Sequence, residues 1–413
     1  MAITILAIGL FIFAAFLFKG VFDRTGIPDV LLLMVCGIVI GPLTGWVVPE
    51  AFGQAGSVLA TLALVIILFE SGVDLELSSL RPSLSATLKI SLVTFSATAA
   101  IVTSVGIAIA GLPPLSALML GAILGGTSSA VVIPLVQSLN VQGKARTVMV
   151  LESALTDVLC IVGLFMLVDA AKKGATSPAH VAISLSETLF FSAGIGIVAG
   201  IAWLLLLRTA RRMPHGSFAS TAMCCVIYGL TEMAGLSGAI AAITFGLVLA
   251  NGRKLARATR LIRPGRLAAF SSREQGFLQE LIFVLKTFFF VYLGLSMKLD
   301  NPSIFTIAAL IVLLVYFARH FFAGLFCDRD ITREHVALTA IMVPKGLAAA
   351  VLAGIPLQQG VAGGETIQAL AYAVVLLSIT LTATLIALQR FMPVRRLYGK
   401  LYRRFADPAE PVR

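Results

Sequence analysis

The chain has 413 residues, of which 59% are hydrophobic and only 12% are charged, and its mean hydropathy is +1.00. A soluble domain carries about 25% charged residues, and half that fraction cannot cover a globule of this size, which excludes a soluble protein. Its 31 Lys and Arg outnumber its 20 Asp and Glu, for a net charge of +11. Because there is almost no soluble mass to bind nucleic acid, this excess indicates basic loops of an integral membrane protein.

Thirteen apolar runs approach or exceed the ~20 residues that a membrane-spanning helix needs. In chain order we expect spans at 2–18, 28–48, 56–70, 86–110, 114–138, 146–168, 181–206, 217–233, 236–251, 280–297, 303–324, 335–355 and 366–389. The longest connection, 252–279, is basic and predicts an interfacial cytoplasmic helix. The sequence therefore predicts an all-α polytopic membrane protein with about 13 transmembrane helices and no soluble domain.

The basic residues predict how the chain is oriented in the membrane. If residue 1 lies outside, most of the 31 Lys and Arg fall in connections on the inner side, and only Lys172, Lys173 and Lys298 fall outside. One missing span would invert every later loop, so the asymmetry also supports the number of spans. We expect the N-terminus outside and the C-terminus in the cytoplasm.

Apart from charges nearer the ends of predicted spans, five charged side chains lie within them, where a charge costs about 2.5–3.5 kcal/mol on insertion scales and usually has a function or a partner. They are Glu152, Asp157, Lys286, Arg319 and Lys345. Because such residues are rare in a membrane, these five are the first candidates for a functional site.

Glu152 and Asp157 share the span 146–168, in the run ESALTDV. An offset of five residues places them about 140° apart on a helix, so they face different neighbours. Ser153 shares the Asp157 face and Thr156 is adjacent to it, which supplies the oxygen ligands that small hard cations prefer. The alternative is that each acid is buried for structural reasons and neutralised by a basic partner.

Two spans carry the signals of interrupted helices, because they combine glycine and proline. These residues free backbone groups, which membrane helices tolerate only where they line a site or cavity. The residues are Gly126, Thr127, Ser128 and Pro134 in GAILGGTSSAVVIP, and Pro344, Lys345 and Gly346 in IMVPKGLAAAV. A simple proline kink in each helix is the alternative.

The two interrupted spans, 114–138 and 335–355, are seven spans apart and therefore cross the membrane in opposite directions. The segments around them would then be equivalent units of inverted topology. Corresponding interrupted helices in inverted halves are the best sequence indication of a secondary-transporter site. The span that carries Asp157 directly follows the first of them.

The run ESALTD at 152–157 resembles the ESxxND motif of the monovalent cation–proton antiporter family, in its bacterial NhaP-like branch related to sodium–proton exchangers. RTGIPDVLLLMVCGIVIGP is similar to the second helix of that family, and LFESGVDLELSSLR to its LFEGGL segment. GLSGAIAAITFGLVLAN and FLQELIFVLKTFFFVYLGL are similar to the ninth and tenth helices. The resemblance covers about 5–390.

The resemblance implies an NhaA-like antiporter fold, with inverted repeats and two crossing broken helices, in which six helices form a core bundle and the others dimerise. The implied division is 1–85 for dimerisation-bundle helices 1–3, 86–168 for core-bundle helices 4–6, 169–279 for helices 7–9 and the basic cytoplasmic linker, 280–389 for helices 10–13 with core helices 11–13, and 390–413 for a cytoplasmic basic tail. A homodimer in the bacterial inner membrane is expected.

The resemblance also assigns roles to residues. The expected ion- and proton-binding set is Asp157, Thr127, Ser153, Thr156 and Ser128. Asp157 is the binding carboxylate in this comparison, and Glu152 is expected to form a structural salt bridge with Arg319.

Four places depart from the family pattern. Thr156 stands where the family has Asn, and TSS at 127–129 replaces a T-D-P motif and so lacks one acid. Lys286 stands where this branch has Asn, and Lys345 takes the place of an arginine. A lysine like Lys286 is typical of electrogenic relatives that carry two aspartates, so the chain mixes signatures of two transport stoichiometries.

We therefore predict a secondary active transporter that exchanges Na⁺, or alternatively K⁺ or Li⁺, for H⁺ by alternating access and supports pH homeostasis. Asp157 would bind cation and proton competitively, because either one neutralises a carboxylate that cannot cross the barrier as a bare anion. Electroneutral exchange is favoured, and electrogenic exchange using Lys286 is the alternative.

Other classes of protein remain as alternatives. A cation channel or a transporter of another solute on the same fold would also be helical and polytopic. Enzymes are disfavoured, since the chain has no H-E-x-x-H, G-x-S-x-G or paired catalytic acids. No cofactor and no nucleic acid is expected, and the partners are the bilayer, the transported ions and a second copy of the chain.

Overall fold

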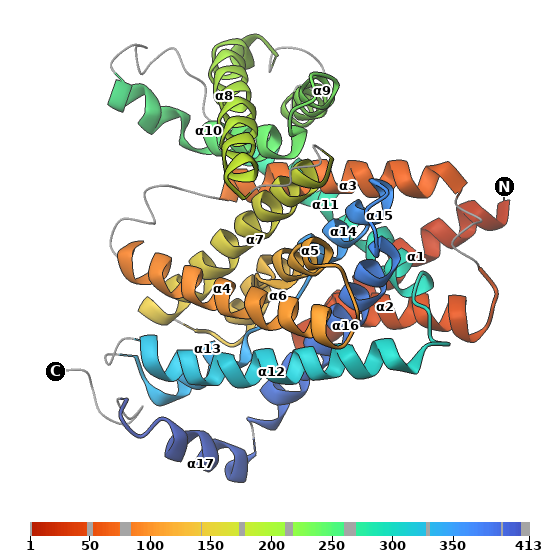
Figure 1. Ribbon diagram of the computed structural model, residues 1–413, viewed down its shortest axis with the longest axis vertical. Coiled ribbons are helices and arrows are strands. Elements are labelled where there is room, and N and C mark those ends of the chain that lie inside the picture. The colour runs from red at the N-terminus through yellow and green to blue at the C-terminus, as the bar shows by residue number, and fades with distance from the viewer. Residues whose placement is uncertain are drawn as a thin grey trace. The chain divides into compact units, whose positions relative to one another are not determined.

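A computed structural model describes residues 2–47, 53–74, 84–141, 143–172, 178–210, 218–259, 270–327, 331–389 and 391–405. Every regular element in these ranges is helical (Figure 1). Contacts between residues group the chain into two compact units. The first comprises Met1–Ala51, Ser83–Cys160 and Thr287–Arg413, and the second Phe52–Pro82 and Ile161–Lys286.

The first unit holds most of the helices. Its elements are α1 (Ala2–Thr25), α2 (Asp29–Ile38), the π-helical turn η1 (Val39–Leu43), α4 (Leu84–Ala108), α5 (Pro114–Leu124), α6 (Ser129–Ser138), the first part of α7 (Gly143–Lys172), the last part of α11 (Ser272–Leu295), α12 (Pro302–Phe326), α13 (Arg333–Ile341), α14 (Leu347–Ala353), α15 (Ile355–Gln358), α16 (Gly364–Leu388) and α17 (Met392–Leu401). In this unit α4, α12 and α16 pack around the short helices α5, α13 and α14.

Two of the short helices, α5 and α14, form the core of the first unit because they are apolar on almost every side. Almost all of α5 from Ser116 to Leu124 is buried, as is α14 apart from one partly exposed residue. A helix that is apolar all round must be enclosed by other elements. The long helices α4, α12 and α16 provide that enclosure.

The second unit consists of α3 (Gly53–Asp74), the rest of α7, α8 (Pro178–Ala210), α9 (Ala219–Met233), α10 (Gly238–Thr259) and the first part of α11. Helix α10 packs against α3, α8 and α9. At its contact with α3 the rings of Phe69 and Phe245 stack with centroids 5.6 Å apart. Gly72 lies so close to α10 that a Cβ atom there would sit 2.1 Å from the Ile243 carbonyl oxygen.

Each predicted span coincides with a helix or with an interrupted pair of helices, so the prediction of an all-α polytopic membrane protein is confirmed. In the described ranges, seven stretches are long and apolar enough to cross a membrane: Leu88–Ala108, Pro114–Ser138, Ala145–Ala171, Glu187–Leu207, Ser272–Leu295, Pro302–Leu325 and Gly364–Leu388. Shorter apolar helices accompany them. The assignment of helices to a dimerisation bundle and a core bundle stays a prediction.

Two segments differ from what the sequence predicts. The predicted span 28–48 ends in the turn η1, which contains Pro42 and closes the helix at Leu43. In the predicted interfacial segment 252–279, residues 252–259 belong to α10 and residues 272–279 to α11. Residues 260–269 lie outside the described residues, and there the interfacial helix stays a prediction. α11 begins directly afterwards with a capping box, in which Ser271 N donates to Glu274 (2.9 Å) and Glu274 N donates to Ser271 Oγ (3.3 Å).

Candidate functional site

Two membrane-spanning elements of the first unit are broken near their middles. α5 ends at Leu124 and α6 begins at Ser129, while α13 ends at Ile341 and α14 begins at Leu347. The broken helices expected from the sequence are therefore present. Gly126 lies in the first break, and Pro344 and Gly346 lie in the second.

Pro134 was expected to mark the first break, and that expectation is wrong. It lies inside α6, and the helix continues to Ser138. A proline removes one backbone donor and kinks a helix without having to end it. The break is instead made at 125–128, where side chains of α7 replace the missing intrahelical partners.

Backbone amides released by the first break donate to α7. The acceptors lie within about one helical turn of that helix, which sets the register between the break and α7. The bonds are Gly126 N to Cys160 Sγ (3.1 Å), Thr127 N to Thr156 Oγ1 (3.1 Å) and Ser129 N to Asp157 Oδ2 (3.2 Å). Buried backbone donors need such partners, so these contacts hold the non-helical segment at membrane depth.

The two breaks touch each other. Ser128 N donates to the carbonyl oxygen of Pro344 at 2.9 Å, and Lys345 Nζ donates to that of Gly126 at 2.7 Å. Only glycine fits at 346, because a Cβ atom there would lie 1.9 Å from Ser128 Oγ. The broken helices thus cross at their interruptions.

Charged side chains meet helix ends of opposite sign at this crossing. The carboxylate of Asp157 accepts from the first residue of α6, at the positive end of that helix dipole. The ammonium of Lys345 lies at the carbonyl of Gly126, just beyond the negative end of α5. Both residues are buried, with 6% and 2% of their surface exposed.

Neutral groups alone surround Asp157 at hydrogen-bonding distance. Ser129 donates twice to Oδ2, from its backbone N at 3.2 Å and from its hydroxyl at 2.5 Å. Among the described residues, no basic side chain forms an ion pair with this carboxylate. The other carboxylate oxygen, Oδ1, receives no hydrogen bond from that part of the chain.

The hydroxyls expected beside Asp157 are directed elsewhere. Ser153 Oγ donates to the Val150 carbonyl (3.0 Å), and Thr156 Oγ1 donates to that of Ser153 (3.2 Å). Thr127 Oγ1 lies 3.3 Å from Thr156 Oγ1. In this structure the partner of the carboxylate is Ser129, which sequence reasoning left out of the set although it belongs to the same TSS run.

The second buried acid of α7, Glu152, forms a bidentate ion pair. Its carboxylate binds both terminal nitrogens of Arg319 on α12, with Nη2 at 2.6 Å from Oε2. Thr94 of α4 adds a hydrogen bond of 2.9 Å to Oε1, and Arg319 Nε donates to the carbonyl of Thr339 on α13 at 3.2 Å. The pair thus joins four helices of the first unit in a fully satisfied network.

A polar cluster on α12 and α16 supports the second break. Ser378 Oγ accepts from the backbone N of Lys345 at 2.9 Å. The hydroxyl of Tyr316 donates to the Ser378 carbonyl at 3.1 Å and also contacts the hydroxyl of Thr382. The sequence contained no spacing that ties these residues to Lys345, because they come from helices distant in the chain.

Lys286, the remaining charged candidate, lies on α11 and belongs to the second unit. Its predicted role in setting the stoichiometry stays a prediction. In the described part of the chain no group of three or more His, Cys, Asp or Glu could hold a metal ion. The arrangement around Asp157 therefore offers one carboxylate and several hydroxyl and carbonyl oxygens, which suit a single small cation or a proton.

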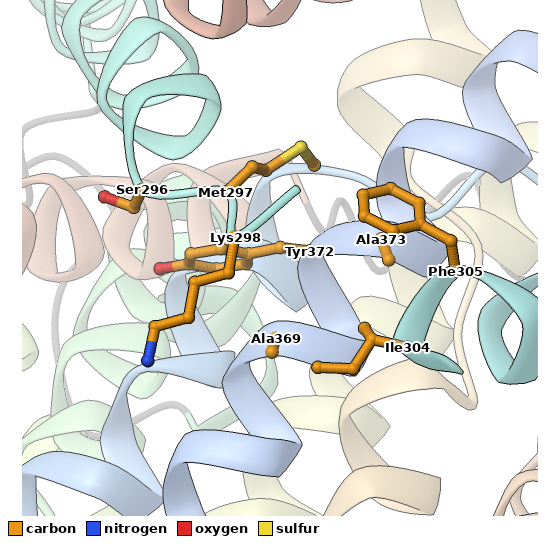
Figure 2. A pocket seen from close by; sticks show the side chains of 8 residues that line it. All are labelled: Ser296, Met297, Lys298, Ile304, Phe305, Ala369, Tyr372 and Ala373. Carbon is orange, nitrogen blue, oxygen red and sulfur yellow. The ribbon is translucent and has the colours of Figure 1, made fainter. Parts of the chain in front are cut away.

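The first unit also contains a small pocket whose lining residues differ from those around Asp157. Its lining residues are Ser296, Met297, Lys298, Ile304, Phe305, Ala369, Tyr372 and Ala373 (Figure 2). At its mouth Lys298 lies 3.7 Å from Glu365, and both side chains are largely exposed. None of these residues belongs to the group around Asp157, so the pocket is not part of the candidate ion site.

The sequence model of the family described as "Sodium/hydrogen exchanger, transmembrane" matches residues 12–388. The chain belongs to this exchanger family. The resemblance to monovalent cation–proton antiporters is thereby confirmed, and the multi-pass membrane architecture of the described helices agrees with it.

Curated relatives of this exchanger chain are antiporters by name. The K(+)/H(+) antiporter NhaP of Alkalimonas amylolytica is 26% identical over 326 residues, which cover 77% of the chain and 56% of that relative. The Na(+)/H(+)-K(+) antiporter GerN of Bacillus cereus is 23% identical over 369 residues, which cover 86% and 88%. The chain spans about half the length of the first of these and 42% of the K(+)/H(+) antiporter NhaP2 of Shewanella sp. strain ANA-3.

A solved structure supports the fold of this exchanger-family chain. The sodium proton antiporter MjNhaP1 from Methanocaldococcus jannaschii superposes with a TM-score of 0.72 at 22% identity, covering 93% of this chain and 99% of that one. The expected antiporter fold is therefore confirmed.

Proposed function

We propose that the chain is a secondary active transporter that exchanges a monovalent cation for H⁺ by alternating access. The observation that carries the proposal is the environment of Asp157, a buried carboxylate on α7 whose hydrogen-bond donors are neutral and come from Ser129. A buried carboxylate that forms no ion pair is costly, so Asp157 gains most from binding a proton or a cation.

Competition at one carboxylate would couple the two fluxes. Proton and cation each cancel the charge of Asp157, and in our proposal each would use the free oxygen Oδ1. Either loaded form could pass the barrier between inward- and outward-open states, while the bare anion could not. Exchange then follows because the site cannot return empty.

The remaining cation ligands would be oxygens of the first break and of α7. In the proposal Thr127, Ser128, Ser153 and Thr156 contribute hydroxyl or carbonyl oxygens once the cation draws them toward Asp157. Thr127 and Thr156 already lie 3.3 Å apart at their hydroxyls, which supports a shared oxygen cluster. Ser129 is not counted in this set, because its hydroxyl already donates to the carboxylate itself.

We assign Na⁺ as the preferred cation, with K⁺ or Li⁺ as alternatives. The names of the relatives include both K(+)/H(+) and Na(+)/H(+)-K(+) antiporters, so cation choice varies within the family. A single exchanging carboxylate supports electroneutral exchange, and electrogenic exchange would require Lys286 to gain and lose a proton. We further propose a homodimer in the bacterial inner membrane, with the N-terminus outside and the C-terminus in the cytoplasm.

Proton flux in proteoliposomes tests this proposal. The purified chain is reconstituted, and Na⁺, K⁺ or Li⁺ is added on one side of the membrane or on the other. The membrane potential is either left free or clamped with valinomycin or another ionophore. Cation-driven proton movement that is insensitive to the potential is expected. Flux of cation without proton movement would instead identify a channel, and the absence of response to any of the three would favour another solute.

A further inference from the structure

The segment that follows the last membrane-spanning helix folds into α17, and this helix packs against the α12–α13 pair (Figure 1). Tyr398 of α17 and the two residues Tyr402 and Phe405, which follow the helix, make the contact with this pair. Only 2% of Tyr402 and 3% of Phe405 remains exposed. Residues 391–405 are therefore packed onto the first unit.

Hydrogen bonds fix the docked face on both helices. On α12, the His320 ring lies 3.2 Å from the Tyr398 hydroxyl, and Tyr402 donates to the His320 carbonyl at 3.2 Å. On α13, Arg333 Nε donates to the Phe405 carbonyl at 2.9 Å. His320 directly follows Arg319, the partner of Glu152, so α17 is anchored next to the buried ion pair.

The outward face of α17 carries an apolar row. Leu397 and Leu401 are one turn apart, and 65% and 59% of their surface is exposed. Phe391 and Met392 at the start of the helix are exposed to a similar extent, at 61% and 60%, and Met392 lies on the side of Arg396 and Lys400. The exposure of Leu397 and Leu401 shows that the described part of the first unit does not cover them.

A basic row runs beside the apolar one. Arg396 and Lys400 each precede a leucine of the apolar row, which turns them about 100° around the helix. Both are exposed, as are Arg403 and Arg404. No acidic residue occurs from Phe391 to Phe405, so this face is purely cationic.

The position of α17 limits what can cover these rows. α16 ends at Leu388 and α17 begins at Met392. A linker of this length spans no more than about 14 Å, and α16 is a membrane-spanning stretch. The helix therefore lies close to the surface of the bilayer, where lipid headgroups are the available partners.

We propose that α17 is an anionic-lipid-binding helix, with Leu397 and Leu401 inserted at the acyl boundary and Arg396 and Lys400 bound to phosphate headgroups such as those of phosphatidylglycerol. Exposed apolar and basic rows side by side are the signature of helices that lie in the membrane interface. Basic side chains next to a membrane-spanning helix attract anionic lipid in the same way. Bound lipid would stabilise α12 and α13 through the contacts of the docked tyrosines.

Thermal unfolding of the full chain in a non-ionic detergent, titrated with phosphatidylglycerol or phosphatidylcholine, tests the proposal without using transport activity. Phosphatidylglycerol is expected to raise the unfolding midpoint at lower concentrations than phosphatidylcholine. In the double variant Arg396→Gln/Lys400→Gln the phosphatidylglycerol concentration for half of the effect should rise about fivefold per side chain removed. Arg396→Lys should bind as the parent does.

The matched control neutralises two other exposed basic residues of the first unit, as Lys89→Gln/Arg146→Gln, and should leave the lipid titration unchanged. Leu397→Gln/Leu401→Gln should weaken the effect of both lipids. Equal action of the two lipids on the parent chain, or coincident titrations of the parent and Arg396→Gln/Lys400→Gln, would overturn the proposal. Dissociation of a dimer by the leucine variant, with the lipid response intact, would assign the face to a second copy instead.

Discussion

Two acids on the same helix have opposite surroundings. Glu152 and Asp157 both lie on α7 and both are buried, with 1% and 6% of their surface exposed. Glu152 is neutralised by the guanidinium of Arg319 and receives a further hydrogen bond from Thr94. Among the described residues, Asp157 receives hydrogen bonds only from Ser129, whose donors are uncharged.

The difference shows how one helix can hold a structural charge and an exchangeable one. A bidentate arginine satisfies both the hydrogen-bonding geometry and the charge of a carboxylate. A carboxylate paired in this way gains little from binding another ion. Neutral donors satisfy part of the geometry but leave the charge in place. Five residues of separation place the two acids on different sides of α7, where the first meets α12 and the second meets the break before α6.

The largest effect is expected from Asp157→Asn. The amide keeps an oxygen that can accept from Ser129, so the fold should persist, but it can bind neither a proton nor a cation in exchange. Cation-dependent proton flux in proteoliposomes should fall to the background of empty vesicles, while the unfolding midpoint changes little. Full exchange by this variant would remove Asp157 from the site.

Glu152→Gln should damage stability rather than exchange itself. It leaves Arg319 as an unpaired buried cation, and breaking a buried pair in this way costs about 3–5 kcal/mol. Equilibrium unfolding in mixed detergents measures the loss, and flux should be normalised to folded protein. The control is the reversed pair Glu152→Arg/Arg319→Glu, which should recover part of the stability. Loss of flux in Glu152→Gln without loss of stability would contradict a structural role.

Ser129→Ala tests the neutral hydrogen bond that the Ser129 hydroxyl donates to Asp157. A hydrogen bond to a charged group contributes about 1.5–3 kcal/mol, and here it stabilises the empty carboxylate. Its loss should tighten cation binding, so that the apparent KM for cation falls about tenfold. Ser138→Ala is the matched control, because its hydroxyl donates to the Leu135 carbonyl within α6 and lies outside the proposed ligand set. A rise in KM for Ser129→Ala would make the hydroxyl a cation ligand and reverse this reading.

A smaller change is expected for Thr94→Val, which removes the hydrogen bond of 2.9 Å to Glu152 but leaves the ion pair. The free energy of unfolding should fall by about 1 kcal/mol. Exchange per folded molecule should stay as in the parent chain. If the loss equals that of Glu152→Gln, Thr94 rather than Arg319 is the main support of the acid.

The smallest effect is expected from Lys286→Gln. If Asp157 alone exchanges ions, proton flux should remain insensitive to the membrane potential in both the parent and the variant. The measurement is flux under clamped potentials of opposite sign. Potential-dependent flux in the parent that disappears in Lys286→Gln would show that the lysine takes part and that exchange is electrogenic.

The membrane class, the helical spans and the short set of buried charges were readable from the sequence, because charge content and hydropathy are local properties of the chain. The interruptions near Gly126 and Pro344 were also readable, since glycine and proline act on their own backbone. Pro134 does not mark the break, because a proline can kink a helix without ending it. A break persists only where neighbouring groups satisfy the freed backbone amides, and the sequence does not show which groups those are.

The tertiary structure alone decided which groups meet across helices. It turned Ser129 rather than Ser153 toward Asp157, joined Lys345 to Gly126 and Ser378, and docked the tail on His320 and Arg333. These contacts depend on the rotation and register of packed helices, which arise from many interactions at once. The sequence by itself thus determined that a few charges lie in the membrane, and packing determined that one of them, Asp157, forms no ion pair with a basic side chain among the described residues.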